Sequence, residues 1–331
     1  MTHNSKLKIG VLMGGPSSEH EVSLETGRKV MKHLDSNKYE VKPIKISRDG
    51  EWHINGAKAK IETALHDIDL AFIAMHGEYG EDGQIQVILE QYNKPYTGSG
   101  VFASQIAMDK SQSKKLFESH GFLIPKSALL KYGERGFLQK FESVSKDGPW
   151  VVKPCSRGSS VGTSIIKNKK DIFDAVHKAF EYDNQVLIEE HIKGREFTCG
   201  VLENYPSREN RKYFALPVTE IIPRKSYQFF DYEAKYKEGA TKEVTPAEIS
   251  RDLTQKIQGI AVAAHALLGC SGYSRSDFII TPKNEIYILE LNTLPGMTQT
   301  SLLPQAAKAA KIEFPELLDK IIYNALKKYY A

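Results

Sequence analysis

Two short runs of alternating polar and apolar residues near the C-terminal end of the chain bring acidic side chains within reach of each other. The first run contains Asp277, the second contains Glu290, and a four-residue turn (282–285) separates the runs. If Thr281 pairs with Ile286 in an antiparallel hairpin, Asp277 lies directly opposite Glu290. The two carboxylates then share one face, because side chains alternate between faces along a strand.

The same register predicts the other members of each face. Arg275 lies opposite Asn292, so both side chains join the carboxylates on the polar face. The opposite face is expected to pack into the core with the side chains of Phe278, Ile280, Leu289 and Leu291.

Two carboxylates that face each other only about 5 Å apart repel and need compensation. A hard divalent cation with oxygen ligands from Asp277, Glu290 and Asn292, and with room for substrate phosphates, is typical of Mg²⁺ sites. The alternative is an ordinary salt bridge in which Arg275 alone neutralises the pair. A slip of one residue in the hairpin would separate the two carboxylates.

A second candidate site follows the β-type run Trp150–Val152. This run leads through Lys153 into a loop of small residues (155–162) that contains two glycines and three serines. Backbone N–H groups in such loops can approach phosphate oxygens closely. No Gly-Lys-Ser/Thr sequence follows, so this is not a Walker A loop, and a plain turn is the alternative interpretation.

Two further polar clusters follow apolar runs in the first hundred residues. Gly14-Gly15 follows the run Leu7–Met13, and Ser18-x-x-Glu21 has the spacing of a capping box. The glycine spacing argues against a Rossmann dehydrogenase, although the predicted helix N-terminus could hold a carboxylate. The cluster that begins at His76 follows a second apolar run, at the strand end where parallel sheets bind ligands; a purely structural histidine is the alternative.

The elements that must position these residues can be predicted from periodicity. Strand and helix patterns alternate over the first ~110 residues, which indicates an α/β fold with a parallel sheet covered on both faces. The polar, aromatic segment 224–246 has no clear period and is expected to be a functional loop. The remaining expected elements are strands at 150–152, 185–188 and 197–202, and helices at 85–92, 114–120, 171–182, 257–268 and 318–329.

Composition limits the class of protein. The 331 residues are 41% apolar and 26% charged, which is typical of a globular chain of two or three domains. A net charge of +4 argues against bulk binding to nucleic acid or to an anionic membrane. The longest uncharged apolar stretch, 259–273, is shorter than the ~20 residues of a membrane span. Three scattered cysteines fit a reducing compartment, so we expect a cytoplasmic protein.

The ordered set of motifs resembles the D-alanine:D-alanine ligases of the ATP-grasp superfamily over nearly the whole chain. The motifs in common are 14–24, His76-Gly77 with 80–83, 96–100, 108–110, Lys153-Pro154, 158–162, 231–236, Arg275-x-Asp277, 290–298 and Ser301-Leu302. The resemblance implies three domains at 1–110, 111–200 and 201–331. The first is the parallel-sheet domain, and the other two form the ATP-grasp fold, with a lid at 224–246.

The resemblance also implies an activity. Members of the family condense two D-alanines into a dipeptide for peptidoglycan, through a D-alanyl phosphate, and convert ATP to ADP and phosphate. They use two Mg²⁺ ions, which Mn²⁺ can replace, and they are usually homodimers. No nucleic-acid or membrane partner is implied.

The resemblance assigns nucleotide and metal contacts residue by residue. Lys110, Lys153 and Lys235 would contact phosphates, under a closing loop of Ser159, Ser160 and Val161. The adenine and ribose would lie against Glu189, Ile192 and Glu196. The two metal ions would be held by Asp277, Glu290 and Asn292, in agreement with the hairpin deduced from the strand alternation.

The resemblance likewise assigns the substrate contacts. The first D-alanine would bind at Glu19, Val22, Ser23 and His76, and the second at Ser301 and Leu302. Arg275 and the Gly296 N–H would stabilise the tetrahedral oxyanion. Glu19, Ser159 and Tyr236 match a hydrogen-bonded triad of the family.

Three alternatives remain at this stage. A ligase that joins D-alanine to D-lactate or another D-acceptor is disfavoured, because in the family the depsipeptide activity accompanies Phe at the position of Tyr236. A different ATP-grasp ligase, such as one acting on biotin or glutathione precursors, would not need Glu19, Tyr236 and Ser301. A non-catalytic nucleotide-binding regulator would show no D-alanine-dependent ATP hydrolysis.

Overall fold

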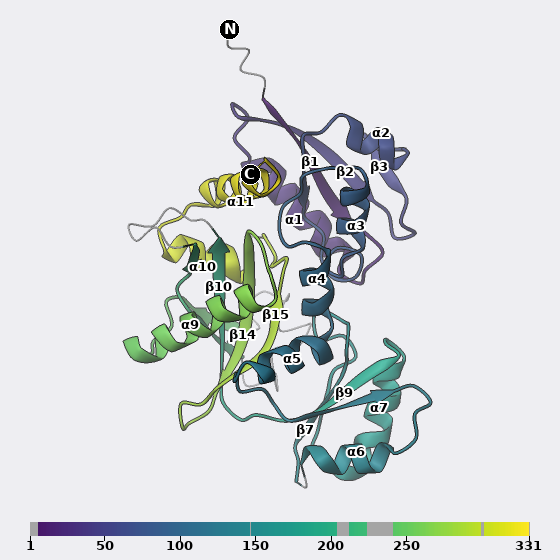
Figure 1. The fold of residues 1–331 in the computed structure, drawn as a ribbon, viewed down its shortest axis with the longest axis vertical. Helices are drawn as coiled ribbons and strands as arrows, with labels where there is room; N and C mark the ends of the chain where they lie inside the picture. Colours follow the sequence, from purple (N-terminus) through teal and green to yellow (C-terminus); the bar gives the residue numbers. More distant parts are fainter. Residues whose placement is uncertain (1–5, 146, 204–211, 224–240, 299–300, 331) are drawn as a thin grey trace.

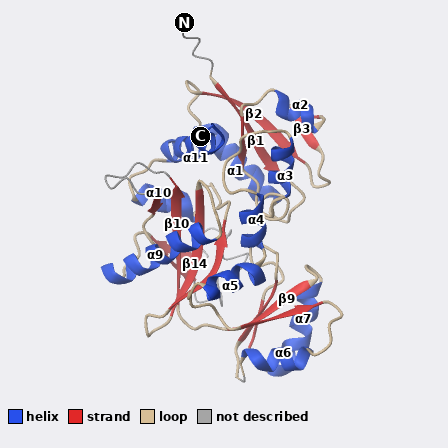
Figure 2. Ribbon diagram, viewed as in Figure 1, coloured by secondary structure: helices blue, strands red, loops and turns tan. Residues whose placement is uncertain are grey.

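Three β-sheets follow one another along the long axis of the molecule (Figure 1). The computed structural model describes all residues except 1–5, 146, 204–211, 224–240, 299–300 and 331. Helices cover the sheets on their outer sides, as the blue and red elements of Figure 2 show. The α/β class predicted from the sequence is confirmed, with the parallel strands confined to the N-terminal sheet.

The N-terminal sheet has the strand order β4-β3-β2-β1-β5, and β1 runs parallel to both β2 and β5. The strand β1 (Leu7–Gly14), which lies between β2 and β5, is buried over its last six residues, as expected for a strand covered on both faces. Its other elements are α1 (His20–His33), β2 (Tyr39–Ile46), β3 (Trp52–Ile54), β4 (Ala57–Lys58), α2 (Ile61–His66), β5 (Leu70–Ile73), α3 (Gln84–Gln91) and α4 (Val101–Met108).

The start of α1 differs from the predicted capping box. Ser18 and Glu21 are exposed, and Glu21 pairs instead with Arg48 at 3.3 Å. The buried Ser17 side chain accepts the Glu19 backbone N–H at 2.8 Å. The predicted capping box is therefore wrong, because the tight glycine turn brings the preceding serine, rather than Ser18, against the first turn of the helix.

The central sheet is antiparallel and has the order β6-β9-β7-β8. Trp150 and Val152 of β7 pack into a hydrophobic cluster with α6 and α7, whereas Val151 and Lys153 line a cavity on the other face. Alternate side chains of β7 therefore face the hydrophobic cluster on one side and the cavity on the other. The elements are α5 (Lys110–Ser119), β6 (Ser127–Lys131), α6 (Phe137–Val144), β7 (Trp150–Pro154), β8 (Ser164–Ile166), α7 (Ile172–Phe180) and β9 (Gln185–Glu190).

The C-terminal sheet is also antiparallel, with the order β13-β12-β10-β14-β15 and with β11 beside β10. Residues 241–244 form its edge strand β13, which pairs with β12. The prediction of a loop over all of 224–246 is therefore wrong for these four residues, whose backbone groups complete the sheet edge. The elements are β10 (Arg195–Glu203), β11 (Tyr213–Ala215), β12 (Thr219–Pro223), β13 (Thr241–Val244), α9 (Arg251–Leu267), β14 (Tyr273–Ile280) and β15 (Ile286–Asn292).

The hairpin of β14 and β15 confirms the predicted register at its polar end. Arg275 pairs with Asn292, and Asp277 pairs with Glu290. All four side chains are partly buried, as expected for a face that borders a cavity.

The other end of this hairpin departs from the prediction. A β-bulge directly after Asp277 shifts the ladder by one residue, so Ile280 rather than Thr281 pairs with Ile286. The prediction that Leu289 faces the core is wrong for the same reason: its side chain lines the cavity between the central and C-terminal sheets. The bulge thus adds an apolar side chain to the site face without moving the carboxylate pair.

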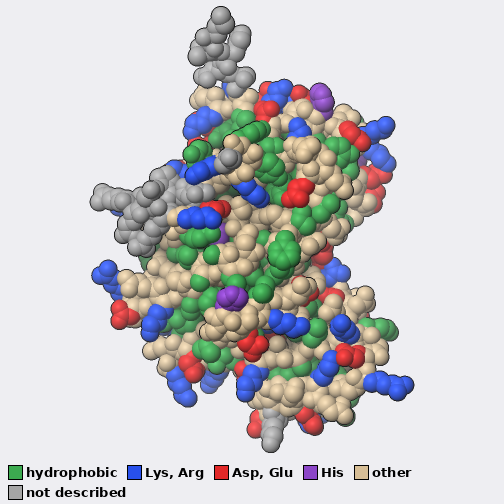
Figure 3. All heavy atoms as spheres, viewed as in Figure 1, with side chains coloured by type: hydrophobic (Ala, Val, Ile, Leu, Met, Phe, Trp, Pro, Cys, Tyr) green, Lys and Arg blue, Asp and Glu red, His purple; other side chains and the backbone are tan. Residues whose placement is uncertain are grey.

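The last two helices are α10 (Leu302–Ala309) and α11 (Phe314–Tyr330). The apolar side of α11 shares one hydrophobic cluster with the N-terminal sheet, and Figure 1 shows it beside α1. Lysine and arginine side chains are interspersed with acidic ones over the face that Figure 3 shows. Of the helices described, none is long and apolar enough to cross a bilayer.

Candidate active site

Two adjoining cavities lie between the three sheets, and both are lined by Lys110 and Glu290. The nucleotide-side cavity lies between the central and C-terminal sheets. The substrate-side cavity lies between loops of the N-terminal sheet and the C-terminal sheet. They hold about 1040 and about 990 Å³ of empty space, part of it open to solvent.

The nucleotide-side cavity combines an apolar slot with a polar rim. The slot is formed by Val151, Ile165, Ile192, Phe197, Ile221, Phe278 and Leu289. The rim carries predicted site residues: Lys110, Lys153, Ser160, Glu189, Glu196, Asp277 and Glu290. A flat apolar slot bordered by convergent charges suits a ligand with an aromatic base and phosphates.

A buried carboxylate, Glu189, lies at the back of this cavity between two ammonium groups. Lys114 is 3.0 Å from one of its oxygens and Lys153 is 2.9 Å from the other. Burial alone would raise the pKa of Glu189, but the two cations hold it below its usual value. Burial lowers the pKa of Lys114 to about 8, whereas Glu189 raises that of the more accessible Lys153 despite burial.

The loop 158–162 has a backbone shaped for anion contact. Ser159 and Ser160 adopt left-handed conformations, with φ of 49° and 58°, and Gly162 follows with φ of 69°. Successive residues of this kind turn backbone N–H groups inward to form an anion-binding concavity. A Cβ on Gly158 would lie 2.8 Å from Glu19 Oε2, so the glycine lets the loop approach the Glu19 carboxylate closely.

The facing carboxylates on β14 and β15 have cationic partners. Asp277 receives two hydrogen bonds of 2.9 Å from Arg275 and one of 2.8 Å from Thr198. Glu290 lies 3.6 Å from Lys110. The alternative, in which Arg275 alone neutralises both carboxylates, is therefore only partly present: Arg275 pairs with Asp277, and Lys110 is the cation near Glu290.

The oxygen ligands that these two carboxylates and Asn292 offer fit Mg²⁺. Asp277, Glu290 and Asn292 supply only oxygen to a metal, and the Asn292 side chain is held by the Leu294 N–H at 2.9 Å. Across the described parts of the chain, no three His, Cys, Asp or Glu side chains group around one point. A metal here would therefore need further ligands, and substrate phosphates and water are the usual ones for Mg²⁺.

The two cavities are joined by a hydrogen bond. Ser159 of the loop 158–162 donates to Glu19 at 2.5 Å, and Arg157, just before this loop, pairs with Glu78. Two of the three members of the predicted triad therefore meet. The third, Tyr236, and the predicted phosphate contact Lys235 lie outside the described residues.

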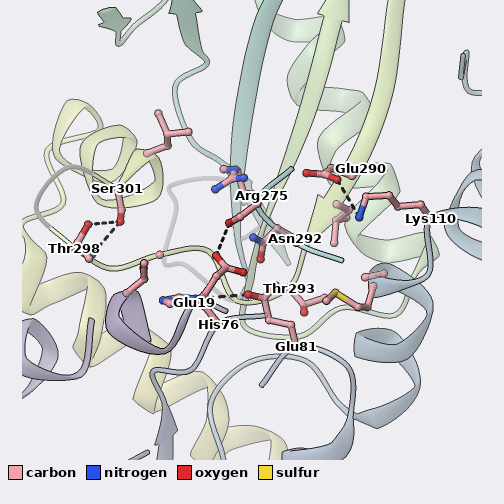
Figure 4. Close-up of a pocket in the computed structure, with 18 of the residues that line it drawn as sticks. Glu19, His76, Glu81, Lys110, Arg275, Glu290, Asn292, Thr293, Thr298 and Ser301 are labelled. Atoms are coloured by element: carbon pink, nitrogen blue, oxygen red, sulfur yellow. Dashed lines mark hydrogen bonds and ion pairs between the residues drawn. The ribbon is translucent and has the colours of Figure 1, made fainter. Parts of the chain in front are cut away.

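A buried imidazole and a buried carboxylate form the floor of the substrate-side cavity (Figure 4). His76 Nδ1 lies 3.1 Å from the Leu294 carbonyl and 3.6 Å from Glu81, and Nε2 lies 2.8 Å from the Thr26 hydroxyl. Burial disfavours the imidazolium, but Glu81 raises the pKa of His76 above its usual value. Burial also raises the pKa of Glu81, so the pair can share a proton.

The far end of this cavity is formed by the start of α10. Ser301 precedes the helix; its hydroxyl accepts the Thr298 N–H at 3.0 Å and contacts the Thr298 hydroxyl at 2.8 Å. A Cβ on Gly296 would lie 2.7 Å from the Ser301 hydroxyl oxygen, so a larger residue here would displace that hydroxyl. Together with Leu302, this helix N-terminus offers N–H groups to a carboxylate. In Figure 4 it lies opposite the Lys110–Glu290 end of the cavity.

Two predicted site residues do not line either cavity. Ser23 is fully buried; its hydroxyl accepts the His76 N–H at 2.9 Å and donates to the Glu19 carbonyl at 3.1 Å. In this structure Ser23 holds the backbone of His76 and Glu19, two residues that do line the cavity, and its predicted contact with substrate stays a prediction. Val161 contributes to the loop through its backbone N–H, which bonds to the Gly158 carbonyl at 3.2 Å. Val22, in contrast, lines the substrate-side cavity as expected.

The sequence analysis missed several residues at the site. Glu81 belongs to the motif 80–83, and its place five residues after His76, in the same polar cluster, is the signal that could have found it. Lys114 follows Lys110 by one helical turn, which puts both on one helix face. Glu243 lines the cavity from β13 and accepts a hydrogen bond of 2.5 Å from Gln305. Because its strand was expected to be a loop, no signal pointed to Glu243.

Comparison with known proteins decides the family. A sequence model described as the N-terminus of D-ala D-ala ligase matches 8–64 and 55–99, and one described as its C-terminus matches 130–323. The chain belongs to the D-alanine–D-alanine ligase family. A ligase of this name from Leptospira interrogans is 40% identical over 97% of this chain and 99% of its own. One from Geobacter sulfurreducens is 41% identical over 96% of this chain and 94% of its own.

Solved structures of ligases resemble the whole chain. The D-alanine–D-alanine ligase of Bacillus anthracis, solved with ATP, has a TM-score of 0.81 and 36% identity, over 98% of this chain and 99% of its own. VanG, a D-Ala:D-Ser ligase of Enterococcus faecalis, has a TM-score of 0.83 and 34% identity, over 97% of this chain and 100% of its own. The ligase fold expected from the motifs is confirmed.

Proposed function

We propose that this protein joins two D-alanines into D-alanyl-D-alanine for peptidoglycan synthesis and converts ATP to ADP and phosphate. The observation that carries the proposal is the junction of the two cavities. There, the hydrogen bond between Ser159 and Glu19 brings the phosphate-type loop against the cavity with the His76–Glu81 pair. A phosphate held on one side can thus meet a carboxylate held on the other.

The nucleotide is assigned to the cavity between the central and C-terminal sheets. Its base would occupy the apolar slot beside Glu189 and Ile192, with the ribose at Glu196. The phosphates would meet Lys110, Lys153 and Lys235 beneath the loop of Ser159, Ser160 and Val161. This placement is supported by the convergence of the described members of this set on one cavity or its closing loop.

Two Mg²⁺ ions, for which Mn²⁺ can substitute, are assigned to Asp277, Glu290 and Asn292. When bound there, they would offset the charge of the phosphoryl group during transfer. Arg275, which pairs with Asp277 in this structure, borders the substrate-side cavity as well, so its guanidinium can face a substrate oxygen. The two roles of Arg275, as counter-ion and as oxyanion partner, require only one position of its side chain.

The chain's own groups account for the reaction in two steps. Glu19 would hold the ammonium of the first D-alanine, Val22 would border it, and His76 would lie near its carboxylate. A carboxylate is a poor electrophile, so it first takes the γ-phosphate to form D-alanyl phosphate. The amine of the second D-alanine, whose carboxylate is held at Ser301 and Leu302, then loses a proton, attacks the acyl carbon and displaces phosphate.

Stabilisation of the tetrahedral oxyanion in the second step is assigned to Arg275 and the Gly296 N–H. Glu19 and Ser159, together with Tyr236, form the predicted network that links both substrates to the nucleotide loop. The lid predicted for 224–246 falls mostly outside the described residues and stays a prediction. The cytoplasmic location is inferred from the scattered cysteines and the homodimeric state from the family resemblance, and light scattering of the purified protein tests the latter.

The deciding experiment measures phosphate release from ATP and Mg²⁺ with D-alanine, with L-alanine, and with D-alanine plus D-lactate or D-serine. The product mass is recorded in each case. Release that requires D-alanine, together with the mass of the dipeptide, is expected. A mixed product formed in preference to the dipeptide would indicate a different acceptor. Release without dependence on D-alanine would contradict the proposed substrate.

A further inference from the structure

Helix α5 directs two lysines, one turn apart, toward the nucleotide-side cavity. Lys110 lines both cavities and lies 3.6 Å from Glu290. Lys114 lies on the same helix face but lines neither cavity, and its side chain is only 2% exposed. Its ammonium is 3.0 Å from Glu189, whose other oxygen is 2.9 Å from Lys153. Lys114 therefore reaches the site through Glu189 alone.

A fully buried lysine is rare, because removing an ammonium from water costs several kcal/mol. The compensation for Lys114 is its ion pair with Glu189, since its Nζ has no hydrogen bond of good geometry within the described chain. Such pairs add little net stability compared with apolar residues of similar volume. A role in orienting Glu189 gives this arrangement a physical purpose.

The two lysines around Glu189 are not equivalent. Lys153 lies on the cavity side and is the one assigned to ATP phosphates, so its charge is shared once the nucleotide binds. Lys114 is 2% exposed and does not line the cavity, so a phosphate bound there would meet Lys153 rather than Lys114. Glu189 is the ion-pair partner of Lys114 in this structure.

We propose that Lys114 is a positioning residue that keeps Glu189 ionised and oriented as an acceptor for the exocyclic amine of the nucleotide base, and thereby sets a preference for ATP over GTP. Adenine presents a donor at this position, whereas guanine presents a carbonyl oxygen that a carboxylate repels. A neutral Glu189, or one that has turned away, would lose this discrimination. The inference rests on the proposed placement of ATP.

The test is Lys114→Met, which keeps the length of the side chain and removes the charge. KM and kcat for ATP and for GTP are measured by D-alanine-dependent phosphate release, and Kd for each nucleotide with Mg²⁺ is measured by calorimetry. The KM for ATP should rise roughly tenfold and the ATP-to-GTP ratio of kcat/KM should fall roughly tenfold, as expected for one hydrogen bond to a charged group. The kcat at saturating ATP should change less than about threefold.

Two controls separate positioning from folding. Lys115→Met removes an exposed lysine from the same helix. It should leave the ATP-to-GTP ratios of kcat/KM and of Kd unchanged. Lys114→Met combined with Glu189→Gln leaves no uncompensated buried charge at this pair, so it should fold even if Lys114→Met alone does not. In the Glu189→Gln background, adding Lys114→Met should leave the ATP-to-GTP ratio unaltered, because the carboxylate that Lys114 orients is gone.

The inference is overturned if folded Lys114→Met keeps the wild-type ratio. It is equally overturned if Lys114→Met lowers the ratio as much in the Glu189→Gln background as in the wild type. A wild-type protein that binds ATP but releases no phosphate with D-alanine would instead refute the proposed function. The ratio of the calorimetric Kd values for ATP and GTP would still decide the role of Lys114.

Discussion

The two cavities each contain a buried glutamate, and the two carboxylates behave in opposite ways. Glu189 of the nucleotide-side cavity is 2% exposed, and Glu81 of the substrate-side cavity is 9% exposed. The pKa of Glu189 is below its usual value, because two lysines flank it. Burial raises the pKa of Glu81, and the charge of Glu19 raises it further, against the opposing effect of His76. Burial alone therefore does not set ionisation; the number and placement of neighbouring charges do.

This difference matches the two kinds of chemistry proposed for the cavities. Phosphoryl transfer needs charges in fixed positions, and the Glu189 carboxylate, whose pKa is lowered by two flanking ammonium groups, stays ionised at neutral pH. Holding an amino acid needs a site that can adapt to the protonation of its ligand, and a shared proton between His76 and Glu81 allows that. The following predictions are ordered by the size of the expected effect.

The largest effect is expected at the carboxylates between the cavities. Asp277→Ala or Glu290→Ala should lower turnover by about 1000-fold or more, because fixed oxygen ligands for the metal–phosphate complex are lost. The unfolding temperature should stay near that of the wild type, since each side chain borders a cavity. Wild-type rates of phosphate release in either variant would refute the metal assignment.

A buried histidine outside both cavities tests the conclusion that neighbouring charges, rather than burial alone, set the ionisation of a buried group. His265 of α9 hydrogen-bonds Ser274 at 2.7 Å, and burial lowers its pKa to about 4. Its folded-state pKa is below that of the unfolded chain, so the stability it contributes is present above about pH 6.5 and is lost as the pH falls toward 4. We expect a loss of up to about 3 kcal/mol in the free energy of unfolding.

Urea titrations at pH 7 and near pH 4.5 measure this loss. His265→Gln removes the titrating group and should reduce the difference between the two pH values. The rule that neighbouring charge decides ionisation fails if His265 titrates like His76, with a pKa above the usual range.

Glu81→Gln tests the substrate-side pair. Without the carboxylate, burial should lower the pKa of His76, so the imidazolium that faces a substrate carboxylate is lost at neutral pH. We expect kcat/KM for D-alanine to fall roughly 30-fold. The alkaline limb of its pH profile should also move to lower pH. An unchanged profile would show that Glu81 does not set the ionisation of His76.

The smallest effect is expected at Thr26, whose hydroxyl contacts the His76 imidazole. Thr26→Val keeps the volume of the side chain but removes the hydroxyl 2.8 Å from His76 Nε2. The cost should be about 1 kcal/mol in the free energy of unfolding, with less than a tenfold change in kcat/KM. A larger loss of activity than in Glu81→Gln would reverse the order of importance of the two partners.

Much of the site could be predicted from local pattern. The period of two along 273–292 was enough to place Asp277 opposite Glu290, because alternation in a half-buried hairpin leaves few registers. The bulge after Asp277 left no trace in the sequence, because an extra residue in an apolar run does not break its hydrophobic character. Leu289 was therefore assigned to the wrong face.

Other misses have a similar cause. The edge strand Thr241–Val244 adjoins a long polar segment, so its short alternation was absorbed into the predicted loop. Ser17 displaced Ser18 at the start of α1 because the glycine turn decides which hydroxyl meets the helix. Lys114 looked like one of several lysines on an amphipathic helix until its burial was known.

By itself, the sequence determined the order of strands and helices, the residue types at each strand end and the ordered motifs that indicate the family. These follow from periodicity and short-range stereochemistry, which act over a few residues. Only the tertiary structure decided which of these groups meet: Glu19 with Ser159, 140 positions along the chain, and Lys114 with Glu189. It also decided their charge states, because a pKa depends on burial and on neighbours that packing brings from distant parts of the chain.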